Sequence, residues 1–125
     1  MHMGLVTLRY LKAHPEAYAQ MEARAAALEA GFNAIVNRLR LPMTIVRFKG
    51  MVCPFFCQGP VASYDDVSRC DTARYGRFFR AMLSRGVLIP PAQFEGFFLS
   101  TVHTAEDIEM TLAAAVEALQ EAYAD

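Results

Sequence analysis

The sequence predicts an α+β domain in which a small antiparallel or mixed sheet is covered by helices on one side. Two kinds of pattern support this prediction. Apolar residues recur every three or four positions in three long segments, as in amphipathic helices. Short β-rich runs lie between those segments. The predicted order is helix, helix, strand, strand, helix, strand, strand, helix, and a sheet with helices on one face is its simplest architecture.

The first forty residues are predicted to form two helices. The segment 4–13 has leucines at near-helical spacing, and Pro15 ends it because proline disfavours helical geometry in the residue before it. A long amphipathic helix then runs to about Arg40. Because its heptad-like spacing lasts only about three repeats and includes Gly31, a core-facing helix is favoured over a coiled coil. Its apolar stripe consists of Tyr18, Met21, Ala25, Leu28, Phe32, Ile35 and Leu39.

Two β-rich runs come next, at 43–48 and 51–56, and Lys49-Gly50 between them indicates paired strands. Pro54 should place the second strand at an edge or a bulge, because proline has no N–H for a central ladder. The stretch 57–66 is polar and rich in turn residues, which predicts an exposed connection.

The clearest amphipathic helix is predicted from about Asp71 to Gly86, a residue type that often follows a helix C-terminus. Its arginines lie off the apolar stripe, so a solvated basic face is expected rather than a phosphate or nucleic-acid site. The stripe itself is Tyr75, Phe78, Phe79, Met82 and Leu83.

The last forty residues contain two short apolar runs and a helix. The runs 87–89 and 97–99 flank PPAQFEG and predict two buried strands joined by a constrained loop. Thr104 and Asp107 have the spacing of a capping box at the start of the last helix. The predicted buried face of that helix is Ile108, Leu112, Ala115, Val116, Leu119 and Tyr123.

The bulk properties indicate one domain, with a helical segment at 1–40 leading into an α/β body at 41–125. A formal charge of −1 and a pI near 6.3 argue against nucleic acid or an anionic membrane as partner. No apolar run reaches the roughly 18 residues of a membrane helix, no export signal is visible and the cysteines are few, so a cytoplasmic protein is expected. The hydrophobic fraction of 54% exceeds the typical value of about 45–50%, so some apolar surface is expected to cover a partner.

Few residues suggest self-contained chemistry. Cys53 and Cys57 have C-x3-C spacing without further ligands nearby, so buried or half-buried thiols are favoured over a metal site. His103 has no carboxylate at a fixed spacing, so a hydrogen-bonded structural role is favoured over that of a base or ligand. The glycine-rich phosphate loops, GxSxG and HExxH do not occur. We therefore expect neither a metal nor a cofactor site within this chain.

Glu95 is the strongest candidate for a site residue. It lies in QFEGFF, between bulky apolar residues in a loop led by two prolines, where an ionised carboxylate must be paired or face a polar cleft. A surface carboxylate at a loop tip is an equally good interpretation from residue type alone.

The run GVLIPPAQFEGFFLSTVHTAEDI at 86–108 gives the sequence a family resemblance, with QFE and HTAEDI as its most specific elements. From Phe55 to Leu119 the chain resembles the closing stretch of the glutamate-1-semialdehyde 2,1-aminomutases, a branch of the class III aminotransferases. The segment 3–32 is similar to the helices that connect the large and small domains of that family. The resemblance implies the C-terminal small domain of a fold-type I aminotransferase.

The complete enzyme of that family is a homodimeric isomerase. It uses pyridoxal phosphate (PLP) or pyridoxamine phosphate to move an amino group within glutamate-1-semialdehyde, giving 5-aminolevulinate for tetrapyrrole (porphyrin) synthesis. In the family, the Schiff-base lysine and the phosphate-binding loops belong to the large domain, and neither Lys12 nor Lys49 matches that lysine's context. The resemblance therefore implies no cofactor in this chain, no activity of the chain alone, and a large PLP-binding domain or a second copy as partner.

By position, Glu95 corresponds to the small-domain glutamate that borders the active-site cleft in the family. It is the one residue carried over as a site candidate, for polar contact or electrostatic tuning at the substrate end. The sequence departs from the family pattern nearby, since Ala92 stands in place of a serine and Gly96-Phe97 in place of an alanine-glycine pair. A phenyl group beside Glu95 is expected to reshape the cleft and is compatible with another amino substrate.

Two other functions remain open on sequence alone. One is a free-standing module that kept this fold and binds a small ligand or a protein. The other is a helical assembly protein that acts through the stripe from Tyr18 to Leu39. A closed pocket within the chain would favour the binding module, and an apolar face aligned with a large domain would favour the enzyme domain.

Overall fold

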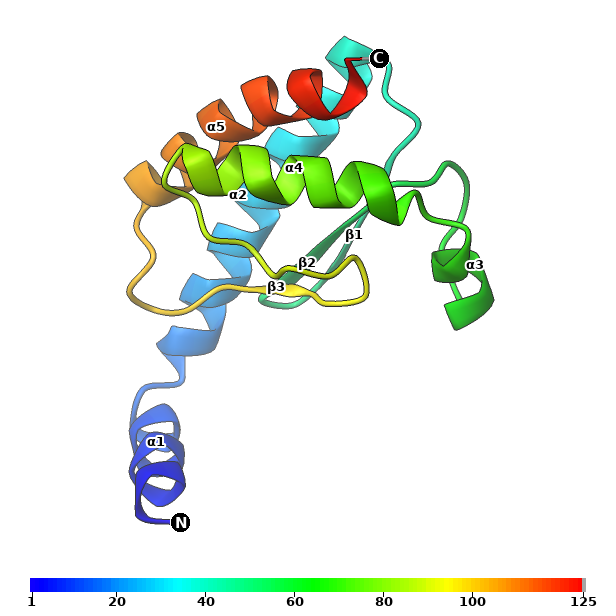
Figure 1. Ribbon diagram of the computed structural model, residues 1–125. Helices are drawn as coiled ribbons and strands as arrows, with labels where there is room; N and C mark the ends of the chain where they lie inside the picture. Colours follow the sequence, from blue (N-terminus) through cyan, green and yellow to red (C-terminus); the bar gives the residue numbers. More distant parts are fainter. Residues whose placement is uncertain (125) are drawn as a thin grey trace.

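The computed structural model describes residues 1–124. Three helices form one layer and a small sheet the other, while the first helix extends away from both (Figure 1). The elements are α1 (His2–Ala13), α2 (Glu16–Leu39), β1 (Thr44–Phe48), β2 (Met51–Phe55), α3 (Tyr64–Ser68), α4 (Thr72–Ser84), β3 (Phe97–Phe98) and α5 (Ala105–Tyr123).

The sheet is antiparallel, with strand order β1-β2-β3. In the turn between the first two strands, Lys49 and not the adjacent Gly50 adopts the left-handed conformation, with a φ of 53°. Figure 1 shows α2, α4 and α5 on one side of this sheet. The predicted α+β architecture, with an antiparallel sheet covered by helices on one side, is therefore confirmed.

Pro54 lies in the middle strand, yet its missing N–H leaves no gap in the ladder. The third strand pairs only with Met51 and Val52, so Pro54 lies beyond its end. There the side chain of Gln93 takes the place of a strand: its Nε2 donates to the Pro54 carbonyl at 2.9 Å, and its Oε1 accepts from the Phe56 N–H at 3.0 Å. Pro54 thus occupies a local edge of a central strand.

The apolar stripe of α2 faces the core of this same domain. Ala25, Leu28, Phe32 and Ile35 are all buried. Tyr18, predicted as the first member of the stripe, is instead exposed, although the neighbouring Ala17 is buried. Packing within the domain buries these side chains, so they are not available to a partner helix. An assembly protein that acts through this stripe is therefore ruled out as an interpretation.

The helix α4 follows the predicted pattern closely. Asp71 caps its N-terminus by accepting from the Arg74 N–H, and Gly86 follows its end with a positive φ of 81°. Tyr75 and Phe78 pack their rings against Phe56, which brings the end of the sheet into the helical core. Leu83, at the far end of the predicted stripe, is exposed.

One prediction for the loops is wrong. The run 87–89 forms no strand, because Pro90 and Pro91 follow it and only Ile89 of the run is buried. The stretch 57–66, predicted as an exposed connection, is largely exposed but leads into the short helix α3. That helix begins with a capping box in which the Ser63 side chain and the Asp66 side chain each accept from the other's backbone N–H.

The last helix begins with the predicted capping box of Thr104 and Asp107. Ile108, Ala115 and Leu119 are buried, whereas Leu112, Val116 and Tyr123 are half-buried. Two further alanines, Ala118 and Ala122, are also fully buried, because α4 packs closely along this side of α5.

No residue of α1 is buried. The helix carries exposed Leu5, Val6 and Leu8 and projects from the body of the domain (Figure 1). Within residues 1–124, no helix combines the length and the apolar character that crossing a membrane requires.

Candidate functional site

The loop that carries Glu95 is fixed at several points. Gln93 is buried and anchors the loop to the edge of β2 through its two amide hydrogen bonds. The start of the loop is held by Tyr75, whose phenol donates to the Pro90 carbonyl at 2.7 Å. The Glu95 N–H donates to the Ala92 carbonyl at 3.1 Å and closes a turn. A rigid backbone therefore presents Glu95.

The residues after Glu95 pin the loop to the sheet. A Cβ on Gly96 would lie 2.7 Å from the Met51 sulfur, so the backbone lies directly against the Met51 side chain, which would have to shift if residue 96 carried a side chain. Phe97 is buried and meets Phe32 edge to face, with ring centroids 6.4 Å apart. Its phenyl group therefore reaches the inner wall of the site rather than standing free beside Glu95.

A groove of about 680 Å³ runs beside this loop. Its floor is apolar and is formed by residues of the loop, of α2 and of α5, including Leu28, Ile89 and Ile108. Leu88 and Phe98 also line the groove, and they are 78% and 75% exposed, so the groove is open to solvent. Its polar groups are Glu95, His103, Asp107 and Thr111. An open apolar groove with few polar groups is suited to being covered by another surface.

Glu95 is the acidic group of the groove whose side chain is not engaged within the domain. Its side chain is exposed and makes no hydrogen bond or ion pair within residues 1–124. Burial raises the pKa of Tyr75, and the nearby negative charge of Glu95 adds to that effect. The Glu95 carboxylate thus acts electrostatically on the Tyr75 phenol, which holds the start of the same loop. It also remains available to an external partner.

The other polar groups of the groove serve local structure. The Nδ1 atom of His103 accepts from the Ser100 N–H at 2.9 Å, which agrees with the predicted structural role. Asp107 accepts from the backbone and side chain of Thr104, and these hydrogen bonds hold the pKa of Asp107 below its usual value. These contacts give both groups a role in holding the loop and the start of α5.

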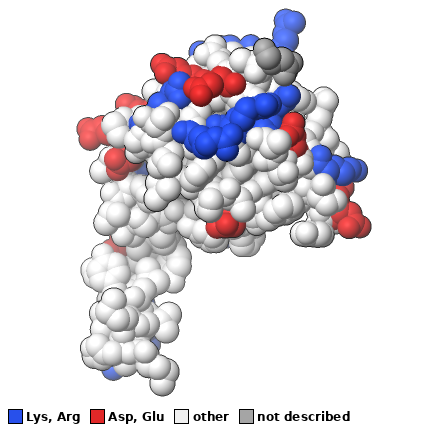
Figure 2. Space-filling model, in the orientation of Figure 1, with Lys and Arg blue, Asp and Glu red and all other residues white. Residues whose placement is uncertain are grey.

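The predicted thiols and arginines have specific positions. Cys53 and Cys57 are half-buried free thiols, and residues 1–124 contain no cluster of three or more metal-ligating side chains. The arginines of α4 do not form a merely solvated face. Arg77 donates to the Ala122 carbonyl, and Arg85 forms ion pairs with Glu117 and Glu121. These contacts tie α4 to α5 beneath the band of positive charge visible in Figure 2.

The side chains of this chain do not by themselves fit PLP. A Schiff base needs a lysine activated inside the pocket that also holds the phosphate. Lys12 is exposed on α1, and Lys49 lies in the β1–β2 turn with its Nζ 3.4 Å from a Glu22 oxygen. Neither lysine lines the groove. Neither lysine is therefore placed beside this groove as an attachment point for the cofactor.

Comparisons with known proteins agree with this geometry. No protein-family model matches the chain. A glutamate-1-semialdehyde 2,1-aminomutase of Clostridium novyi is 52% identical over 97% of the chain, which spans 28% of that enzyme. The crystal structure of a glutamate-1-semialdehyde-aminomutase from Pseudomonas aeruginosa superposes with a TM-score of 0.78 at 27% identity, over 86% of this chain and 24% of that one. A variant of the Pseudomonas enzyme was solved in complex with PMP. An omega-transaminase from Sphaerobacter thermophilus shares the fold, with a TM-score of 0.79 at 24% identity over 97% of this chain and 27% of its own.

The fold is thus that of the corresponding domain in class III PLP aminotransferases. Over nearly its whole length, the chain is similar to the C-terminal part of glutamate-1-semialdehyde 2,1-aminomutases. It spans little more than a quarter of the length of those relatives.

Sequence reasoning missed two residues that shape the site. Gln93 was read only as part of the QFE motif, although it is the buried anchor of the loop. Tyr64 stacks on Phe94, next to Glu95, with ring centroids 5.9 Å apart. The Ser63–Asp66 spacing is a capping signal that could have revealed α3, but no local pattern predicts which ring Tyr64 meets.

Proposed function

We propose that this chain completes the active-site cleft of a glutamate-1-semialdehyde 2,1-aminomutase, in which a large PLP-binding domain holds the cofactor and this domain supplies one wall. The observation that carries the proposal is the open apolar groove with the unpaired Glu95 carboxylate at its edge. The homologous enzymes share the domain over nearly its whole length. The activity is the conversion of glutamate-1-semialdehyde to 5-aminolevulinate.

The groove supports this function better than a free-standing small-ligand module. A small-ligand site usually encloses most of its ligand, whereas here large apolar side chains such as Leu88 and Phe98 are exposed at the groove. A second protein surface over the groove would remove these side chains from water. The apolar residues of α1, none of them buried, offer a further contact for the large domain.

In this proposal Glu95 acts on the substrate by position and charge. Its rigid loop holds the carboxylate at the groove edge, where closure by the large domain would lower the local dielectric and strengthen its electrostatic effect. Glu95 would orient a polar or cationic group of the substrate and is not required to transfer a proton. PLP would supply the amino-transfer chemistry from the large domain.

The proposal is tested by joining this chain to the preceding part of the Clostridium novyi aminomutase, which is 52% identical in the shared region. We expect the fusion to bind PLP and to form 5-aminolevulinate. The Glu95→Gln fusion should lose about 10- to 100-fold in kcat, because one preorganised charge is removed. Glu109→Gln, at an exposed position of α5 outside the groove, is the matched control and should keep full activity.

The same Glu95→Gln change should leave the isolated chain within about 0.5 kcal/mol of its original unfolding free energy, because the side chain is exposed and unpaired. A strongly destabilised isolated variant together with normal turnover of the fusion would show that Glu95 is structural. An inactive fusion that nevertheless folds and binds PLP would contradict the proposed activity.

The chain alone should form no stable PLP aldimine and should have no activity. After mixing with PLP and desalting, we expect no stoichiometric aldimine absorbance and no lysine that borohydride reduction traps specifically. A stoichiometric adduct on Lys12 or Lys49 would contradict this expectation.

A further inference from the structure

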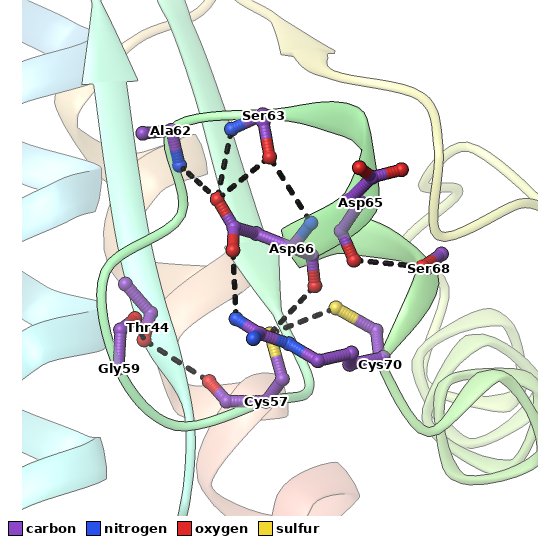
Figure 3. A network of polar contacts seen from close by, with 10 residues as sticks. Thr44, Cys57, Gly59, Ala62, Ser63, Asp65, Asp66, Ser68 and Cys70 are labelled. Atoms are coloured by element: carbon purple, nitrogen blue, oxygen red, sulfur yellow. Dashed lines mark hydrogen bonds and ion pairs between the residues drawn. The ribbon is translucent and has the colours of Figure 1, made fainter.

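Two of the three thiols lie in direct contact at the base of one loop. The Cys70 thiol is 3.0 Å from the Cys57 sulfur, across a loop that leaves β2 and returns to the start of α4 (Figure 3). Cys57 also lies 4.0 Å from the Asp66 carbonyl. The third thiol, of Cys53, makes no such contact and lies among the residues next to the Glu95 loop.

The backbone holds the two thiols opposite each other. The Asp71 N–H donates to the Phe56 carbonyl at 3.0 Å, so the residues that flank the loop are already joined. The Thr44 hydroxyl lies 3.0 Å from the Cys57 carbonyl and 2.9 Å from the Gly59 carbonyl (Figure 3). These contacts fix the first residues of the loop to β1. Two thiols held in this way have the proximity that favours a bond between them.

The loop itself is ordered by one carboxylate. Asp66 accepts from the backbone N–H groups of Ala62 and Ser63, each at 3.0 Å, and from the Arg69 guanidinium at 2.8 Å. These hydrogen bonds lower the pKa of Asp66 and keep α3 formed next to the thiol pair. The sulfur atoms therefore stay in contact without any covalent link.

The two sulfurs differ in access to solvent. Cys57 is half-buried and lines a surface cavity, whereas Cys70 is 7% exposed. Burial, followed by the contact with Cys57, raises the pKa of Cys70 to about 12. Cys57 is consequently the thiol that an external oxidant reaches first, and Cys70 is placed to react second.

We propose that Cys57 and Cys70 form a redox modification site that hydrogen peroxide converts into an intramolecular disulfide. The Cys57 thiol loses its proton, and the thiolate sulfur attacks one peroxide oxygen, so that the O–O bond breaks and a sulfenic acid forms; the hydroxide that leaves takes up the released proton and becomes water. The Cys70 sulfur then attacks the Cys57 sulfur, the S–S bond forms, and the sulfenic oxygen leaves as a second water. The pair loses two electrons and two protons in total, and a dithiol reductant reverses the modification.

The disulfide closes the loop that contains α3. This helix carries Tyr64, whose ring stacks on Phe94 beside Glu95. A covalent bond at the base restricts local opening of the loop, and the oxidised protein should be cut more slowly by trypsin at Arg69 under native conditions. The modification would thus stiffen the support on one side of the candidate site.

The test uses the whole chain, reduced and then treated with a few equivalents of hydrogen peroxide. Thiols are then blocked with a maleimide in denaturant. We expect the intact mass to show loss of two hydrogens and one maleimide adduct in place of three. Peptide mapping should link the tryptic peptide 50–69 to the peptide 70–74. Cys53→Ser, the matched control, should still form the bond, whereas Cys57→Ser and Cys70→Ser should not.

Circular dichroism of each reduced variant shows whether it is folded, so a failure to form the bond can be separated from a failure to fold. Slower tryptic cutting at Arg69, lost again on reduction, is a second expected result. Three maleimide adducts after peroxide treatment, a Cys53-containing disulfide, or only sulfinic acid at Cys57 would each overturn the proposal.

Discussion

At the scale of single residues, Gln93 shows how one polar side chain can replace part of a strand. The third strand ends after two residues, and the Gln93 amide satisfies both the Pro54 carbonyl and the Phe56 N–H beyond it. The same residue positions the loop that carries Glu95. The polar Gln93 side chain can be buried because both its amide oxygen and its amide nitrogen are hydrogen-bonded.

Replacing Gln93 with methionine should destabilise the protein by about 2 to 4 kcal/mol. The change keeps the side-chain length but leaves one buried backbone acceptor and one buried donor without partners, at about 1 to 3 kcal/mol each. Urea unfolding should show a lower midpoint at an unchanged m-value. Gln120→Met, at an exposed position of α5, should stay within about 0.5 kcal/mol. Equal effects of the two substitutions would refute the anchoring role.

At the scale of elements, Gly31 sets the distance between α2 and α5. A Cβ at this position would overlap the Leu112 side chain from α5. Glycine within a helix is less favourable than alanine by about 1 kcal/mol. From the sequence alone, Gly31 is therefore only destabilising. The close helix pair explains why the cost is tolerated.

Gly31→Ala should therefore destabilise the protein by about 1 kcal/mol, since overpacking at about 1 to 3 kcal/mol outweighs the gain in helix propensity. Adding Leu112→Ala should cost less in the Gly31→Ala background than in the original protein, because it removes the clash. Gly76→Ala in α4 is the control. Its Cβ would meet only Arg80 at an ordinary 3.5 Å, so this variant should gain up to about 1 kcal/mol. Thermal unfolding of the four variants measures these differences.

The capping boxes of α3 and α5 should make stability depend on pH in the acid range. Hydrogen bonds from Thr104 lower the pKa of Asp107 from its ordinary value of 3.8. A lowered folded-state pKa means that the stabilisation is complete above the unfolded value and disappears as pH falls through the folded value. Asp66 acts in the same direction. Urea unfolding from about pH 6 to about pH 3 should therefore show falling stability, with a shallower fall in Asp107→Asn. An unchanged slope in that variant would contradict the assignment.

The elements differ in how well local sequence predicts them. The helices α2, α4 and α5 were predicted within a few residues because each has an apolar stripe within its own segment, and α4 and α5 also have a side-chain cap at their start. The run 87–89 was wrongly predicted as a strand, because a short apolar run is equally compatible with a buried loop. Only a partner strand could have decided between them, and the two following prolines have no N–H to donate to such a strand.

At the scale of the whole molecule, two parts of the domain carry groups of exposed apolar side chains. The first is α1, which has no buried residue. The second is the sheet face that the helices leave uncovered, where Val46, Phe48 and Phe98 are exposed. Figure 2 shows the charged side chains over α4 and the neighbouring upper surface, with α1 and the lower part of this view mostly uncharged. These surfaces have the character of areas that contact another protein.

We expect the isolated chain to self-associate through these surfaces, most simply as a symmetric dimer. Sedimentation velocity over a concentration series should show a rising average mass together with binding of an apolar dye. Leu8→Lys tests α1 and Phe48→Lys tests the sheet face, and at least one should shift association to about tenfold higher concentration or more. Met110→Lys, at an exposed position of α5, is the control. A monomer at all concentrations without dye binding would contradict this prediction.

The sequence by itself determined the fold class, the positions of the long helices, the β1–β2 hairpin and the resemblance that identified the family, because each of these is encoded in residues close together along the chain. It also singled out Glu95 as the site candidate. Only the tertiary structure decided that Glu95 is unpaired, that Gln93 replaces a strand, that Gly31 meets Leu112, and that Cys57 meets Cys70. These are contacts between segments distant in sequence, and periodicity, capping and turn signals carry no information about which distant side chain will meet which.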